Sequence, residues 1–365
     1  MTGLICCTLD CNLACSYCYE GNGKNCKYPD KIKINRNFKE AKARLIDYLD
    51  QLYNYNQCSL TRVIWHGGEP TLVDCELLDE IMQDQKDKGH NIEWGIQSNG
   101  TLITEEYASV LSKHGVMIGV SIDGLRDQHN KYRVFKNGNP TFDIIMRNID
   151  LLQSKGVTCG GLITITDNNI DHLIEIYDLF AEKNMNFNFN ALFPNDNGTT
   201  VELNALKFAD KICDLFDYWI NDQQHRITIS PFMQIIEAFV GSQFRVPACH
   251  WAKDCSKSFS AIDTNGDLYP CEHWVGNKSF RFGNIANGLE SELLNCTYFC
   301  DRHECLKNGD CKDCEIWELC YGGCPWNAYE LFGDINRKDS SICLGRKAII
   351  GHIRQTLKKN GKIKE

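Results

Sequence analysis

The sequence lacks the long apolar stretches and the excess positive charge that would place it in a membrane or on nucleic acid. No segment approaches the roughly 18 uninterrupted apolar residues of a membrane-spanning helix. Acidic residues outnumber basic ones, 48 to 39, and the net charge of −9 argues against a nucleic-acid binder held by a general positive field. The first residues contain no basic segment followed by an apolar run, so we expect no signal peptide and a cytoplasmic location.

Long internal repeats and low-complexity tracts are absent as well. Apolar residues make up 43% of the chain and charged residues 24%, which is ordinary for a globular protein and excludes disorder, collagen and coiled coil. A length of 365 residues predicts two domains, or one large barrel with an appendage.

Cysteine is abundant, with 21 residues in the chain. A chain this long buries a sizeable core without disulfides, and in a reducing cytosol many cysteines indicate metal ligation or redox chemistry. Six lie in the first 26 residues and eleven lie between Cys249 and Cys343, which chance core thiols would not produce.

Residues 1–235 alternate short apolar runs with longer amphipathic segments. The short runs are rich in Val, Ile and aromatic residues and predict buried strands at 3–9, 62–66, 92–97, 116–122, 158–165 and 187–192. Helical spacing appears at 38–53, 75–88, 104–113, 142–152 and 169–182, with Ala41, Leu45, Tyr48 and Leu52 on one stripe and Ile145, Ile149 and Leu152 on another. We expect residues 203–241 to be helical.

This alternation predicts an α/β fold of parallel, right-handed βα units. The unit length suits a partial (β/α)6 barrel, and a doubly wound open sheet is the structural alternative. Gly-rich or polar residues follow the second, third and fourth strands, which is the edge where parallel α/β folds place their sites. From Ala248 the chain is cysteine-rich with few long periodic runs, so we expect a core at 1–235 and a small metal-organised domain at 236–365.

Three cysteines follow the first predicted strand with the spacing C-x3-C-x2-C, at Cys11, Cys15 and Cys18. Soft thiolate ligands suit an iron–sulfur cluster or zinc. A closed zinc site would need a fourth ligand, which Cys6, Cys7 or Cys26 would supply. Three ligands on a cluster instead leave one iron open to a small molecule.

This spacing, with Tyr17 before the last cysteine, resembles the radical SAM superfamily. The resemblance implies a partial barrel in which these cysteines bind a [4Fe–4S] cluster and S-adenosylmethionine chelates the open iron. Reductive cleavage then yields a 5′-deoxyadenosyl radical that abstracts a substrate hydrogen. By the same resemblance, the cofactor contacts are Tyr17, Gly67, Gly68, Glu69, Gln97, Asn99, Ser121, Asp123, Arg133, Ile163 and Leu192.

A second set of eight cysteines lies in the tail. Cys249 precedes a C-x10-G-x4-C segment, Cys255 to Cys271; a C-x2-C-x5-C-x3-C segment and Cys343 follow. Eight cysteines are enough for two fully ligated [4Fe–4S] clusters.

This order resembles the SPASM domain, the twin-cluster extension of peptide-modifying radical SAM enzymes. The resemblance implies a first auxiliary cluster on Cys249, Cys255, Cys271 and Cys324, and a second on Cys311, Cys314, Cys320 and Cys343. Zinc at some of these positions is the alternative. Cys296, Cys300 and Cys305 fall outside the pattern and are interpreted as buried thiols or replacement ligands.

Two reactions fit this resemblance. The segment from Glu272 to Gly276, followed by Phe280–Ile285, is more similar to maturases that cross-link ribosomally made peptides through a thioether or C–C bond, which we therefore favour. Anaerobic sulfatase-maturating enzymes, which oxidise Cys or Ser to formylglycine, are the alternative. They carry an Asp base directly after the YPC cysteine, where this chain has Glu272, so Glu272 is the candidate catalytic base.

The partners implied are a peptide or protein substrate and a flavodoxin- or ferredoxin-type electron donor. Because the chain begins almost at its first strand, we expect no fused recognition domain and, for peptide maturation, a separate recognition protein or direct leader binding. A non-catalytic iron–sulfur electron carrier is the hypothesis from another class.

Overall fold

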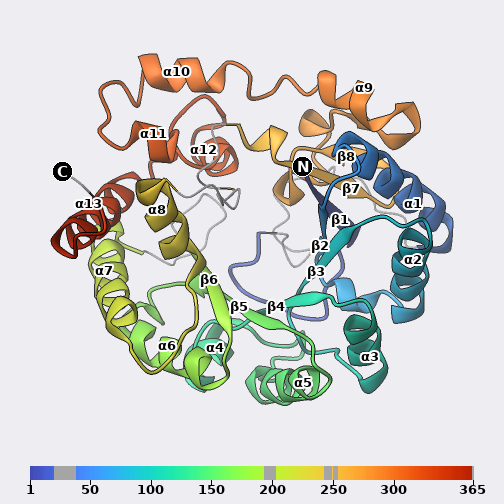
Figure 1. Ribbon diagram of the computed structural model, residues 1–365, viewed down its shortest axis with the longest axis horizontal. Helices are drawn as coiled ribbons and strands as arrows, with labels where there is room; N and C mark the ends of the chain where they lie inside the picture. Colours follow the sequence, from blue (N-terminus) through green and yellow to red (C-terminus); the bar gives the residue numbers. More distant parts are fainter. Residues whose placement is uncertain (20–37, 193–202, 242–248, 250–253, 364–365) are drawn as a thin grey trace. The chain divides into compact units, whose positions relative to one another are not determined.

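The computed structural model describes residues 1–19, 38–192, 203–241, 249 and 254–363 (Figure 1). The chain forms two compact units that interleave along the sequence. Unit 1 comprises Met1–Ser121, Asn130–Gly160 and Cys255–Tyr298, and unit 2 comprises Ile122–His129, Gly161–Asp254 and Phe299–Glu365.

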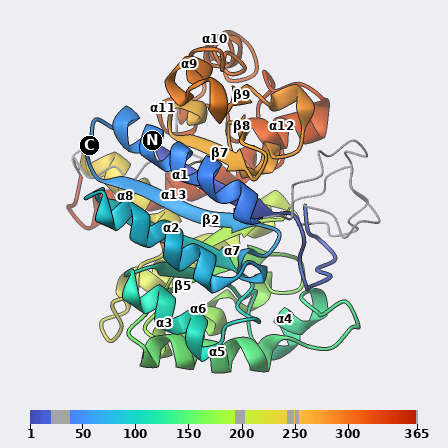
Figure 2. The same ribbon diagram turned by 90° about the vertical axis from the view of Figure 1, so that its right-hand side faces the viewer.

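Unit 1 is built on a parallel sheet. Its consecutive strands are β1 (Thr2–Thr8), β2 (Thr61–Gly67), β3 (Ile92–Ser98) and β4 (Met117–Ser121), each paired in parallel with the next. The helices of this unit are α1 (Phe38–Tyr55), α2 (Cys75–Asp87), α3 (Glu105–Lys113) and α5 (Phe142–Ser154). Helices α1 and α2 lie along the same side of β1 and β2 (Figures 1 and 2).

The hydrophobic patterns explain these elements. In β2, alternate residues Thr61, Val63 and Trp65 are buried, as period-two spacing requires of a strand packed on one face. The two predicted helical stripes are confirmed, because each of their residues is at most 1% exposed: Ala41, Leu45, Tyr48 and Leu52 on one, and Ile145, Ile149 and Leu152 on the other.

The cysteine-rich segment continues the core sheet. Strand β7 (Phe259–Asp263) pairs in parallel with β1, with Thr2 opposite Phe259, and then forms an antiparallel hairpin with β8 (Asp267–Tyr269). The short β9 (Gly283–Asn284) pairs with β8, and α9 (Leu289–Leu294) contacts α1.

Unit 2 contains the last of the alternating strands and helices predicted for residues 1–235, and most of the cysteine-rich C-terminal region. The Ile122 N–H donates to the Leu162 carbonyl (3.0 Å) and the Leu192 N–H to the Ile165 carbonyl (2.8 Å). Within this unit, these bonds link β5 (Cys159–Ile165) to Ile122 and to Leu192, which follows β6 (Asn186–Ala191). The helices of unit 2 are α6 (Leu173–Glu182), α7 (Ala205–Asn221), α8 (Ser230–Val240), α10 (Arg302–Asn308), α11 (Trp317–Cys320), α12 (Pro325–Phe332) and α13 (Cys343–Lys359).

The predicted α/β class with a parallel core and a cysteine-rich tail is confirmed. Within unit 1, strands β1 to β4 follow one another in chain order, whereas a doubly wound sheet reverses its order at a switch point. Most helices described after Ala248 are short, as expected, and the 17-residue α13, which packs on α7, is the long one. Residues 203–241 form two helices, and α4 (Arg126–Tyr132) was not expected. The domain boundary at 235 stays a prediction.

Within the part of the chain that the structure describes, no helix is long and apolar enough to cross a membrane.

Candidate active site

The loop with Cys11, Cys15 and Cys18 leaves the end of β1 and is fastened by the turn after β2. The Gly68 N–H donates to the Thr8 carbonyl (2.7 Å), and the Glu69 N–H to the Asp10 carbonyl (2.9 Å). A Cβ at Gly67 would lie 2.1 Å from the Thr8 oxygen, and one at Gly68 would lie 2.4 Å from the Asp10 oxygen. The two glycines are therefore required where the turn meets the start of the cysteine loop.

The other side of the loop is held by residues 132–135. The Ala14 N–H donates to the Val134 carbonyl (2.8 Å), and Leu13 forms an isolated bridge with Phe135. The Arg133 guanidinium carbon lies 5.4 Å from the centroid of the Tyr17 ring, within cation–π range. Tyr17 and Arg133, both predicted cofactor contacts, are thus brought together.

Glu69 is completely buried, and its carboxylate accepts hydrogen bonds from neighbouring protein groups. Its Oε1 accepts bonds from the Thr71 N–H (2.9 Å), the Thr71 hydroxyl and the Ser98 hydroxyl (2.8 Å), while Oε2 accepts from the Asn99 N–H (2.7 Å). Burial raises the pKa of Glu69, and these hydrogen bonds oppose the rise. The carboxylate therefore joins the ends of β2 and β3.

Asn99 connects the Glu69 carboxylate to the cysteine loop. Its Nδ2 donates to the Asn12 Oδ1 (2.9 Å) and lies 3.6 Å from the Cys11 Sγ as a donor. The Asn12 Nδ2 in turn donates to the Thr101 hydroxyl oxygen (2.8 Å), and the Thr101 O–H donates to the Asn99 Oδ1 (2.7 Å). Burial raises the pKa of Cys11.

The remaining predicted cofactor contacts lie at strand ends in both units. In unit 1 the Gln97 Nε2 donates to the Ser121 hydroxyl (3.1 Å). In unit 2 the Asp123 Oδ1 accepts the Thr164 N–H (3.0 Å), and the side chain is 1% exposed. Ile163 is buried on β5 and Leu192 is partly buried just after β6.

The four cysteines predicted for the second auxiliary cluster gather in unit 2. Electrostatic interactions connect Cys311 with the thiols of Cys314, Cys320 and Cys343. Burial, followed by these neighbouring sulfurs, raises the pKa of Cys311 to about 11. Soft ligands that converge in this way suit an iron–sulfur cluster.

The ligands predicted for the first auxiliary cluster are distributed over both units. Cys255 and Cys271 belong to unit 1 and are partly buried; Cys249 and Cys324 belong to unit 2, the former exposed and the latter buried. Cys26, the alternative zinc ligand, lies outside the described residues.

The segment after Cys271 reaches the cysteine loop within unit 1. Residues Glu272–Trp274 form a 3₁₀ turn, and the His273 ring contacts the ring of Tyr19, which follows Cys18, with centroids 4.4 Å apart. The Glu272 carboxylate is 3.9 Å from the His273 Nε2 and its side chain is 23% exposed. Glu272 therefore stands one residue from a direct contact with the predicted cluster loop.

Sequence reasoning missed several residues that organise these sites. Asn12, Ser98 and Thr101 carry the hydrogen bonds between strand ends and loop. Tyr19 and His273 join two motifs that are far apart in the chain. Asn12 was detectable from its place inside the cysteine loop, and Ser98 from the polar residues at the end of the third strand; Thr101, Tyr19 and His273 have no signal in a single sequence.

The chemistry of these residues fits the cofactors that the resemblance implies. Cys11, Cys15 and Cys18 would hold a cluster by soft thiolates, with Asn99 and Asn12 orienting the first of them. When bound, S-adenosylmethionine and the cluster supply the radical chemistry, while the protein positions and shields the reacting groups.

One family model matches the first half of the chain. Residues 5–180 match the family model of the Radical SAM superfamily. Together with the parallel α/β core, this match shows that residues 5–180 carry a radical SAM domain.

The relatives narrow the resemblance further. The serine-type anaerobic sulfatase-maturating enzyme of Bacteroides thetaiotaomicron is 26% identical over 368 residues, covering 94% of this chain and 86% of that protein. The cysteine-type enzyme of Clostridium perfringens is 28% identical over 335 residues, covering 86% of this chain and 85% of that protein.

Solved structures agree. Native anSMEcpe with bound AdoMet and the Cp18Cys peptide is 25% identical and covers 98% of both chains, with a TM-score of 0.81. Streptococcus suis SuiB bound to S-adenosylmethionine has a TM-score of 0.66 at 18% identity, covers 94% of this chain and 76% of its own, and shares the fold alone. The chain is thus similar to anaerobic sulfatase-maturating enzymes over nearly its whole length.

Proposed function

We propose that this radical SAM enzyme oxidises a Cys or Ser side chain of a peptide or protein substrate to formylglycine, as the names of its relatives suggest. The observation that carries the proposal is the extent of the similarity, which covers 94% of the chain and 86% of the relative. This similarity favours sulfatase maturation over the peptide cross-linking preferred from the sequence.

This oxidation removes a hydrogen atom, a proton and an electron from the substrate's side-chain carbon and its S–H or O–H group. One hydrogen atom goes to the 5′-deoxyadenosyl radical, one proton goes to a base, and one electron goes to an acceptor. A thioaldehyde formed from Cys is hydrolysed by water to the aldehyde with release of hydrogen sulfide, whereas Ser gives the aldehyde directly. Glu272, placed beside the cysteine loop through His273 and Tyr19, is the candidate base, and the clusters proposed on the eight tail cysteines are the candidate electron acceptors.

The test uses anaerobically reconstituted holoenzyme with S-adenosylmethionine and the Cp18Cys peptide, with its Cys→Ser and Cys→Ala analogues as matched substrates. We expect an aldehyde, trapped by a carbonyl reagent and located by mass spectrometry, on the Cys peptide, the Ser analogue or both. The Ala analogue should remain unmodified.

The cross-linking alternative predicts a different product. A ribosomal peptide substrate would lose two hydrogens, its cysteine would resist alkylation, and no carbonyl reagent would react. This product, without any aldehyde on a sulfatase-type peptide, would contradict the proposal. Absence of 5′-deoxyadenosine from reduced holoenzyme would favour the electron-carrier hypothesis.

A further inference from the structure

Arg346 is a buried cation in the cysteine-rich tail that the proposed reaction does not use. It lies in α13, three residues after Cys343, and is only 4% exposed. Removing a guanidinium from water is costly unless anions and hydrogen-bond acceptors compensate its charge. The groups around Arg346 therefore indicate which anions and acceptors compensate its buried charge.

The groups that interact with Arg346 include two cysteine sulfurs and a carboxylate. Its Nη1 donates to the Cys320 Sγ at 3.5 Å, and Cys324 and Asp339 interact with it electrostatically. The Asp339 Oδ2 also accepts a bond from the Asn327 amide (2.8 Å). Cys320 and Cys324 are the cysteines predicted for two different auxiliary clusters, so one fixed cation acts on ligands of both.

The loop between these cysteines is held firmly. Tyr321, Gly322 and Gly323 all have positive φ, at 47°, 81° and 79°. A Cβ at Gly323 would lie 3.0 Å from the Arg346 Nη1 and 2.7 Å from the Asp339 Cβ, so glycine leaves the space that the guanidinium needs. The Arg302 Nη2 donates to the Gly322 (3.3 Å) and Gly323 (3.1 Å) carbonyls. The distance between Arg346 and Cys320 is thus set by the packing around it.

We propose that Arg346 is a positioning residue that raises the reduction potential of the auxiliary cluster ligated by Cys320, and to a lesser degree that of the cluster ligated by Cys324. This inference rests on the proposed function only in requiring clusters at these cysteines. Reduction of a cluster adds one electron and transfers no atom, so the reduced state carries one more negative charge. A buried cation that donates a hydrogen bond to a ligand sulfur stabilises that state more than the oxidised one.

The experiment is a redox titration with dithionite, followed by electron paramagnetic resonance, on reconstituted holoenzyme. For Arg346→Gln we expect the equilibrium constant for one-electron reduction of the cluster ligated by Cys320 to fall tenfold. This corresponds to a reduction potential about 59 mV lower. Arg346→Lys should recover most of this shift. The matched control is Arg354→Gln, which removes the same charge from an exposed position of the same helix and should leave all potentials unchanged. Wild-type potentials in Arg346→Gln would overturn the inference.

The Asp339→Asn variant distinguishes an electrostatic effect on the reduction potential from structural damage. It tests the inference by itself if Arg346→Gln does not retain its iron. Removing the carboxylate leaves the guanidinium less compensated, so the potential should rise, opposite in sign to Arg346→Gln. An unchanged or lowered potential in Asp339→Asn would contradict the inference. Formylglycine assays on the wild type are read separately: shifted potentials without any aldehyde would reject the proposed function alone, and aldehyde with unshifted potentials would reject this inference alone.

Discussion

Glu69 shows how a single buried carboxylate organises the cofactor end of unit 1. It accepts four hydrogen bonds from Thr71, Ser98 and Asn99, and Asn99 in turn contacts the Cys11 sulfur. Replacing one carboxylate oxygen by an amide would point an N–H at groups that already donate. The motif therefore has an internal role in addition to the cofactor contact that the resemblance implies.

We expect Glu69→Gln to lower the free energy of unfolding by about 1–3 kcal/mol, because a buried donor then faces another donor. Affinity for S-adenosylmethionine should fall too, since Asn99 and the cysteine loop lose their anchor. Denaturant unfolding and equilibrium binding measure the two effects. Glu106→Gln, at an exposed position of α3, is the control, and equal stability of both variants would refute the assigned role of Glu69.

Glu272 tests the proton step of the proposed reaction. We expect Glu272→Gln to retain cleavage of S-adenosylmethionine, because the residue is not among the predicted ligands, but to stop product formation. The yields of 5′-deoxyadenosine and of peptide aldehyde separate these effects. Glu272→Asp restores the carboxylate on a shorter arm and should recover part of the activity. Unchanged aldehyde yield in Glu272→Gln would remove this residue from the mechanism.

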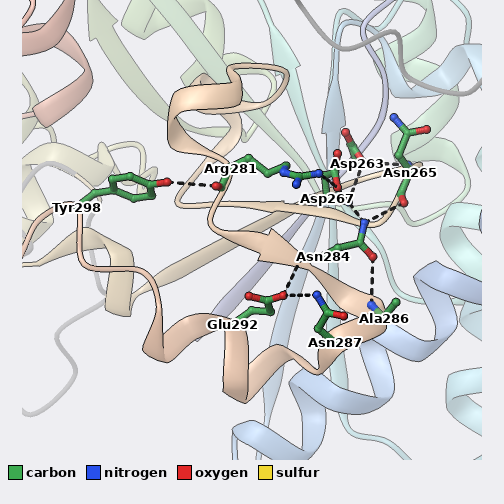
Figure 3. A network of polar contacts seen from close by, with 9 residues as sticks. All are labelled: Asp263, Asn265, Asp267, Arg281, Asn284, Ala286, Asn287, Glu292 and Tyr298. Carbon is green, nitrogen blue, oxygen red and sulfur yellow. Dashed lines mark hydrogen bonds and ion pairs between the residues drawn. The ribbon is translucent and has the colours of Figure 1, made fainter.

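At the scale of elements, the hairpin of β7 and β8 buries two carboxylates in a small network (Figure 3). The Asp263 Oδ1 accepts the backbone N–H groups of Asn265 (2.9 Å) and Asp267 (3.0 Å), while its Oδ2 is buried and has no hydrogen-bond partner among the residues that the structure describes. Asp267 pairs with Arg281 (2.8 Å). Burial and, second, the like charge of Asp267 raise the pKa of Asp263 to about 6.

This pKa predicts a pH dependence of stability. Because the unfolded value is about 3.9, the native state holds an extra proton between the two values, and stability falls as the pH rises through about 6. Asp263→Asn keeps the acceptor oxygen and removes the charge, so we expect it to unfold with about 1–3 kcal/mol more free energy at pH 7.5 and to differ little at pH 4. Anaerobic thermal unfolding across this range tests it; parallel pH profiles for the two proteins would contradict the assignment.

The same hairpin marks the limit of what the sequence predicts about the fold. The strands of residues 1–192 could be predicted because each carries its own apolar run and turn residues. The parallel pairing of β7 with β1 joins residues more than 250 positions apart, and no local pattern records it. Helix α13 was missed because its buried face includes Arg346, which in a sequence looks like a solvent-exposed cation.

The candidate site divides in the same way. Cysteine spacing identifies the predicted ligands, since a metal cluster imposes the same soft residues at short intervals. The Glu69 and Asn99 contacts and the pairing of Tyr19 with His273 depend on side-chain directions at strand ends, which only the fold sets.

At the scale of the whole molecule, the two cysteine groups make separable predictions about iron and activity. Three [4Fe–4S] clusters require about twelve irons per chain. Cys15→Ala should lose about four irons and all cleavage of S-adenosylmethionine, because it removes a predicted ligand of the cluster with the open position. Cys314→Ala should lose a similar amount of iron but retain that cleavage, because Cys314 belongs to the group around Cys311 in unit 2. Cys58→Ala, at an exposed position outside both groups, is the control and should keep the full iron content. Iron analysis and 5′-deoxyadenosine yield measure both quantities, and a wild-type content near four irons, or activity that survives Cys15→Ala, would contradict this assignment of the cysteines.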